Sequence, residues 1–237
     1  MARNDFTINK QRIIGQIHYR PTLSSFEAVS QAAKLLEDEF ADWVAPKPDA
    51  ITLFTAKDKK SIEITADTIT YVKEGPQNDN ELTAFIEKIF DKVTKDFDVT
   101  EIRRIGFRKT QIFDTPFSFT DIVSLLYKKL YPSSEDFKKI SGDKARDVQF
   151  VLDSTNKTFL NHVQIGPLKQ EEVAAHFQSK FIIKNAKEET VPEQSLFFDV
   201  DVALEESLNA DNTLEKFKQL MSESKRIEKA YFDYLYS

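Results

Sequence analysis

Two aspartates separated by one residue are the first candidates for chemistry in this chain. Asp199 and Asp201 lie in the segment FFDVDV, whose alternating apolar and acidic residues are typical of a strand with one buried face. Residues two apart on a strand project from the same face, so the two carboxylates would lie side by side. Such a pair can bind a divalent cation or raise one another's pKa. No third ligand occurs at a characteristic spacing, so we favour a solvated outer face over a metal site.

A basic cluster on an earlier predicted strand is the candidate ligand-binding group. Arg104 and Arg108 share a strand face, with Gly106 between them. Guanidinium groups bind carboxylates and phosphates in a bidentate fashion, so an anion site is one interpretation. Cross-strand ion pairs with the surplus of acidic residues are the other interpretation. We favour the ion pairs, because runs of charge usually form solvated faces.

Two of the 3 histidines fall on predicted strands and complete the set of candidate ligand-binding residues. His18 lies on the first strand and His162 on a later one, without the H-x-H or H-E-x-x-H spacing of a histidine metal site. A nucleophile–base pair stays open, because such partners meet in space rather than in sequence. The sequence lacks the G-x-S-x-G, P-loop and Rossmann patterns. We therefore favour ordinary sheet histidines.

Composition limits the classes of function. The formal net charge of −6 disfavours nonspecific binding to nucleic acid or to an anionic membrane. Cysteine is absent, which excludes disulfides, thiolate zinc sites and cysteine nucleophiles, and only 5 Gly are available for phosphate-binding loops. The lack of an N-terminal apolar segment indicates a cytoplasmic protein, and no apolar run is long enough to span a bilayer. We expect no cofactor.

The strands and helices that must position these residues follow one order twice. Residues 1–100 predict β-α-β-β-β-α, including a helix whose apolar stripe reaches Trp43 and a capping box at Ser24. Residues 101–237 predict the same order, with insertions at about 131–147 and 167–194 and a second capping box at Ser118.

Short identities support an internal duplication. Ile14-Gly15 matches Ile105-Gly106, and the segments DNELTAF and DNTLEKF begin the last helix of each half. We expect an α+β fold of two tandem related lobes, with a mostly antiparallel sheet and helices packed on one face. The other face would be partly open and lined by Thr, Gln, Glu, His and Arg side chains. An undivided α+β domain is the alternative.

The segment RIGFRKTQIFDTP is similar to the strand signature Gly-Leu-Arg-Tyr-Ile-Asn of a sporadically distributed family of bacterial proteins of about this length. Gly106 and Arg108 fall on the Gly and Arg of that signature, and Phe107 replaces its Leu. The late Asp-x-Asp strand and the C-terminal aromatic helix also resemble that family. The resemblance implies a bacterial source and a two-lobed α+β build, and it implies no activity.

The last predicted helix has aromatic residues around most of its circumference, which is more than a single core-facing stripe requires. Packing within the chain is the default, and a contact with a protein partner or a second copy is the alternative. The sequence thus favours a non-enzymatic binding or protein-interaction module. A metal-dependent hydrolase or nuclease using Asp199 and Asp201, and a nucleic-acid binder using Arg104 and Arg108, are the alternatives. The aromatic residues concerned are Tyr231, Phe232, Tyr234 and Tyr236.

Overall fold

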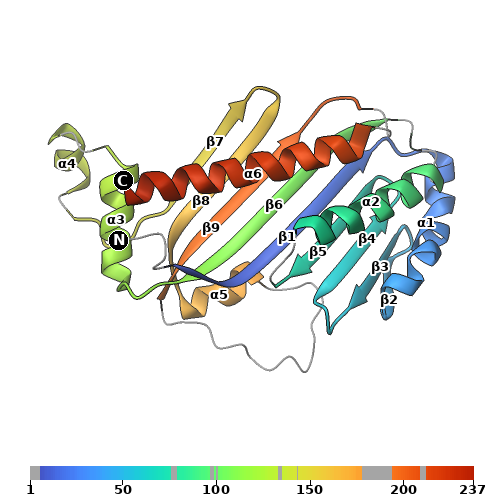
Figure 1. The fold of residues 1–237 in the computed structure, drawn as a ribbon, viewed down its shortest axis with the longest axis horizontal. Coiled ribbons are helices and arrows are strands. Elements are labelled where there is room, and N and C mark those ends of the chain that lie inside the picture. The colour runs from blue at the N-terminus through green and yellow to red at the C-terminus, as the bar shows by residue number, and fades with distance from the viewer. Residues whose placement is uncertain are drawn as a thin grey trace.

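The protein is an α+β structure built on one antiparallel sheet of nine strands, in the order β2-β3-β4-β5-β1-β6-β9-β8-β7 (Figure 1). The computed structural model describes residues 6–75, 79–96, 99, 101–132, 135–142, 144–177, 194–208 and 212–237. The strands are β1 Thr7–Tyr19, β2 Asp42–Lys47, β3 Ala50–Thr55, β4 Lys60–Thr65, β5 Thr68–Glu74, β6 Ile102–Asp114, β7 Phe150–Asn156, β8 Phe159–Lys169 and β9 Gln194–Leu204. The α-helices are α1 Leu23–Leu35, α2 Asp79–Asp96, α3 Phe119–Leu130, α4 Glu135–Ser141, α5 Gln170–Phe177 and α6 Thr213–Tyr236.

Alternation along the central strands separates an apolar face of the sheet from a polar face. In β1, Ile13 and Ile17 are buried and belong to the main core, and in β6 Phe107 joins them. Phe217 and Leu220 of α6 are fully buried in the same core. Each large apolar side chain removed from water in this way stabilises the fold by about 1.5–3 kcal/mol. The polar residues between these positions face the other way.

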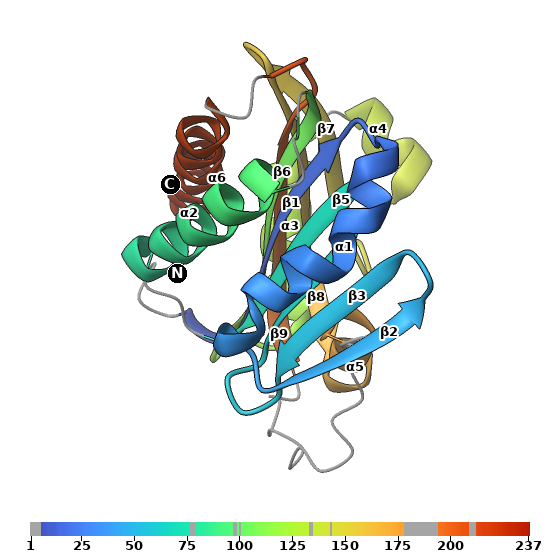
Figure 2. The same cartoon turned by 90° about the vertical axis from the view of Figure 1, so that its right-hand side faces the viewer.

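Most helices cover the apolar face. The helices α2 and α6 lie side by side on it, and α1 covers the end formed by β3 and β4 (Figure 2). The helix α3 adds Ile122, Val123 and Leu126 to the same core from the end of the sheet where β8 and β9 lie. The fold class, the antiparallel sheet and the helix-covered face are thus as the sequence predicts.

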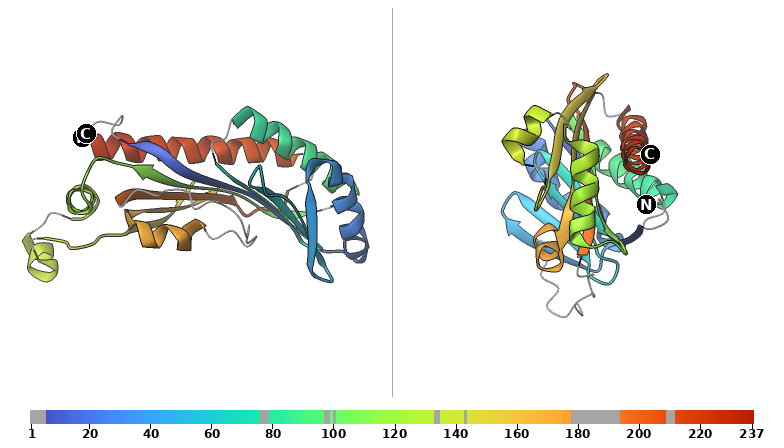
Figure 3. Two further views of the ribbon diagram at one scale, coloured as in Figure 1. Left: turned by 90° about the horizontal axis from the view of Figure 1, so that it is seen from below. Right: turned by 90° about the vertical axis from the view of Figure 1, so that its left-hand side faces the viewer.

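One helix departs from the expected one-sided arrangement. Figure 3 shows α5 on the side of the sheet opposite α6 and α2. Its Val173 forms a second, smaller core with Ile112, Leu168 and Phe197, which lie on the polar face. These apolar residues gather at one end of that face, so α5 covers that end and leaves the rest of the face to polar side chains.

On both sides of the central β1–β6 pair, the first strand of a half is followed outward by the later strands of that half in reverse chain order. On one side β1 is followed by β5, β4 and β3, and on the other β6 is followed by β9, β8 and β7. In the central pair, Gly15 lies opposite Phe107 and Gln16 opposite Gly106. This order agrees with the connectivity that two related lobes require, and the duplication itself stays a prediction. The helices α4 and α5 fall inside the predicted insertions, of which residues 133–134, 143 and 178–193 lie outside the described part of the chain.

The first half contains one strand more than the sequence predicts. We expected the first helix to carry Trp43, but α1 ends at Leu35 and Trp43 lies on the edge strand β2 with 69% of its surface exposed. Pro46 within β2 is tolerated because an edge strand has an outer side on which the missing N–H is not needed. The first cap also differs: Thr22, not Ser24, is the N-cap of α1. The predicted capping box at Ser118 is confirmed.

None of the helices in the described ranges has both the length and the apolar character needed to cross a membrane.

Candidate functional site

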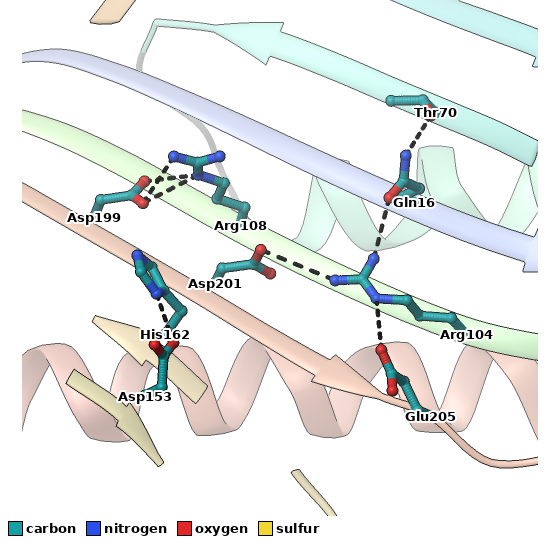
Figure 4. Close-up of polar contacts among 9 residues, drawn as sticks. All are labelled: Gln16, Thr70, Arg104, Arg108, Asp153, His162, Asp199, Asp201 and Glu205. Carbon is teal, nitrogen blue, oxygen red and sulfur yellow. Dashed lines mark hydrogen bonds and ion pairs between the residues drawn. The ribbon is translucent and has the colours of Figure 1, made fainter. Parts of the chain in front are cut away.

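All six residues singled out in the sequence lie on the polar face, on four adjacent strands. Strand pairing explains this, because residues directly opposite one another in a sheet point to the same side. Thus His18 lies opposite Arg104, Arg108 opposite Asp201, and Asp201 opposite His162. The six residues are His18 from β1, Arg104 and Arg108 from β6, Asp199 and Asp201 from β9, and His162 from β8. Figure 4 shows all of them except His18.

Asp199 is the centre of a closed cluster. Its carboxylate is completely buried and accepts hydrogen bonds from Nε of Arg108 at 3.0 and 3.1 Å. Nη2 of Arg108 lies 3.0 Å from the same carboxylate, and the Thr110 hydroxyl donates to it at 2.5 Å. Burial lowers the pKa of Arg108, but the hydrogen bond and the charge of Asp199 outweigh it, and the net pKa is raised. Asp199 is therefore committed to an internal ion pair.

Arg104 is the centre of an open cluster in which every ion pair is longer. Its Nη1 donates to Oε1 of Gln16 at 3.1 Å, and Nε2 of Gln16 in turn donates to the hydroxyl of Thr70 at 3.0 Å. Its Nη2 lies 4.0 Å from the carboxylate of Asp201, and its Nε lies 3.5 Å from that of Glu205. These contacts orient the guanidinium, and 27% of the Arg104 side chain stays exposed.

Gly106 makes room for the Arg104 side chain. A Cβ atom built on Gly106 would lie 2.9 Å from Nη1 of Arg104, closer than real contacts allow. The bare backbone therefore lets the guanidinium lie along the strand and reach Gln16 on β1. Gly15 serves the apolar face instead, where a Cβ would lie 2.9 Å from the ring of Phe217.

A hollow of about 360 Å³ opens beside Arg104, over β6, β9, β8 and β7. Asp153 of β7 lies directly opposite His162 of β8, and its Oδ1 is 2.7 Å from the ring Nδ1 of His162. The rim of the hollow is accessible, since the side chain of Asp153 is 81% exposed and that of Glu205 is 58% exposed. The lining residues are Arg104, Asp153, Ser154, Thr155, Leu160, Asn161, His162, Asp201, Ala203 and Glu205.

Burial shifts the pKa values of Asp201 and His18 in opposite directions, and in each case it disfavours the charged form. Burial raises the pKa of Asp201, and the nearby charges of Arg104 and Arg108 reduce this effect without cancelling it. Burial also lowers the pKa of His18, and the charge of Arg104 lowers it further. The ionised form of Asp201 is therefore only partly compensated by its surroundings.

The arrangement bears on two predicted sites: a metal site at Asp199 and Asp201, and an anion or nucleic-acid site at Arg104 and Arg108. The two aspartates share a face as predicted, but the expected solvated face is wrong for Asp199, whose carboxylate already holds a guanidinium. Within the described ranges, no group of three His, Asp or Glu side chains is placed to hold a metal ion. The favoured interpretation of Arg104 and Arg108 as members of cross-strand ion pairs is confirmed. An anion or a nucleic acid at these arginines would meet the carboxylates that already face them.

The aromatic residues of the last helix pack largely within the chain. Phe232 is buried against Phe6, Phe113 and Phe198. Tyr231 packs on Phe150 and Phe198, and the hydroxyl of Tyr234 donates to the backbone carbonyl of Lys129 at 2.8 Å. The side chain of Tyr236 lies outside the described part. Packing within the chain, the default expectation for this helix, thus accounts for the aromatic residues that can be placed.

Four partners that define the site had no role assigned from the sequence alone. Thr110 could have been found, because it lies two residues after Arg108 and so shares its strand face. Gln16 shares a face with His18 for the same reason. Glu205 follows the acidic strand closely in sequence, but Asp153 has no local signal at all. Its position depends on the pairing of β7 with β8. Neither a protein-family model nor a curated protein matches this sequence.

Proposed function

We propose that this protein is a non-enzymatic interaction module that binds a positively charged side chain of a partner protein in the hollow beside Arg104. The observation that carries the proposal is the charge of the lining. Three carboxylates, of Asp153, Asp201 and Glu205, face one guanidinium and the imidazole of His162. A cation entering the hollow gains more from the carboxylates than it loses to Arg104.

The geometry of Arg104 supports the same proposal. Its distances of 4.0 Å to Asp201 and 3.5 Å to Glu205 leave carboxylate oxygens available to a second donor. Burial raises the pKa of Asp201, and a cation bound nearby would lower that pKa again by stabilising the ionised form. Binding of a cation should therefore weaken as Asp201 becomes protonated.

A peptide titration tests the proposal. The uniformly ¹⁵N-labelled protein is titrated into the low-millimolar range with Ac-Gly-Arg-Gly-NH₂ and, as the charge control, with Ac-Gly-Glu-Gly-NH₂. We expect amide shifts at residues 153–155, 160–162 and 203–205 with the arginine peptide alone. Exposed charges contribute up to about 1 kcal/mol each, so Glu205→Gln should weaken binding by about fivefold or less.

A matched variant outside the hollow is the control for this titration. Glu74, the last residue of β5, pairs with Arg12 of β1, and Glu74→Gln should leave the affinity unchanged. The proposal is wrong if neither peptide shifts these amides, or if both peptides shift them equally.

A further inference from the structure

The two edges of the sheet differ in how well they are protected against pairing with another strand. The edge strand β2 contains Pro46 and the charged residues Asp42 and Lys47, and its register with β3 shifts between Val44 and Lys47. Proline, charge and a bulge are the devices by which natural sheets blunt an edge. The edge formed by β2 is therefore a poor template for a further strand.

The edge formed by β7 has fewer of these devices, with neither a proline nor a bulge. Its segment FVLDSTN contains no Pro, Gly, Lys or Arg and a single charge, Asp153. Its register with β8 runs without a shift from Phe150 to Asn156. In the part of the chain that the structure describes, β7 ends the strand order and pairs with β8 alone. Residues 151–155 are exposed, including the apolar side chains of Val151 and Leu152.

The β7 edge adjoins the hollow. Asp153, Ser154 and Thr155 of β7 are part of the hollow's lining. A strand added to β7 would place every second side chain on the polar face, and one of these would lie directly beside the carboxylate of Asp153. An opposite charge at that cross-strand position is favourable, and a like charge is unfavourable. The position therefore selects for lysine or arginine.

We infer that the partner is an extended polypeptide segment that adds as a strand to β7 and directs a basic side chain toward Asp153 and the hollow. This inference rests on the proposed function and names its partner class. Backbone hydrogen bonds along the free edge supply affinity, and the acidic hollow supplies the preference for a basic residue. A second copy of this chain fits less well, because each copy carries a net charge of −6 and would bring its own Asp153 to the shared edge.

Amide hydrogen exchange on the labelled full chain tests this inference. The probe is the peptide Ac-Val-Lys-Val-Lys-Val-Lys-NH₂, and Ac-Val-Glu-Val-Glu-Val-Glu-NH₂ is the charge control. With the lysine peptide, we expect alternate amides between residues 150 and 156 to exchange about tenfold more slowly, and the β2 amides of residues 42–47 to stay unchanged. Asp153→Asn should weaken binding of the lysine peptide by about threefold, whereas Asp42→Asn on β2 should not.

The outcomes separate the two proposals. If the arginine tripeptide shifts the hollow residues but the lysine peptide leaves the β7 amides unprotected, strand addition is wrong and the binding module stands. If neither peptide binds, both proposals fail. Slow exchange of the β7 amides in the protein alone, together with a concentration-dependent dimer in sedimentation, would assign the edge to a second copy and overturn the peptide as its occupant.

Discussion

The polar face contains two clusters, each formed by an arginine and its carboxylate partners. The clusters differ in how closely the opposite charges approach one another. The Asp199 cluster is buried, with three nitrogen–oxygen distances to Arg108 of 3.0–3.1 Å. The ion pairs of the neighbouring Arg104 cluster measure 3.5 and 4.0 Å, and a hollow opens beside it. Two aspartates two residues apart on β9 thus lie in different surroundings. The closed cluster is committed to an internal ion pair, whereas the open cluster borders the hollow that we propose as the partner site.

The largest expected effect is the loss of the Asp199 carboxylate. Asp199→Asn should lower the free energy of unfolding by about 2–3 kcal/mol, because Arg108 loses a buried partner. The effect stays below that of a fully buried pair, since the side chain of Arg108 is 44% exposed and can turn to water. Urea unfolding at pH 7 measures it. Asp201→Asn is the matched control, with an expected change below about 0.5 kcal/mol; equal losses in both variants would contradict the comparison.

A smaller effect is expected for the hydroxyl groups that complete each cluster. Thr110→Val removes a buried donor to Asp199 and should lower the free energy of unfolding by about 1–2 kcal/mol. Thr70→Val removes an acceptor for Gln16 in the open cluster, where water can replace the hydroxyl, and should change it by less than about 0.5 kcal/mol. The same urea measurement distinguishes them, and a larger loss for Thr70→Val would reverse the assignment of closed and open clusters.

The smallest expected effect is on the pH dependence of stability. Burial raises the pKa of Asp201 above 3.8, so the folded state holds this proton more tightly than the unfolded state does. The wild type should therefore lose stability relative to Asp201→Asn as pH rises from about 3.8 through the folded pKa, and the difference should be constant above it. Urea midpoints of both proteins across this range test the sign. A difference that grows in favour of the wild type would show that Arg104 overcompensates burial.

The sequence by itself determined that the sheet has two different faces and which side chains of a strand lie on the same face. Spacing by two places Arg104, Gly106 and Arg108 on one side of a strand, and the same rule places Asp199 and Asp201 together. The α+β class and the capping box at Ser118 were also predictable, because they depend on residues close in sequence. The end of the first helix was not, since the helical spacing of Trp43 is overridden by its pairing with Leu53 on β3.

Only the tertiary structure decided which aspartate is closed and which is open. Arg108 and Asp199 are separated by 91 residues, and their meeting depends on the register of β6 against β9. The position of Asp153 beside His162, and the exposure of β7 as the less protected edge, depend on strand order in the same way. Alternation is fixed by local backbone geometry, but register is fixed by the packing of helices and strands distant in sequence. The residues of the polar face could therefore be predicted from the sequence, but the pairing of its charged side chains could not.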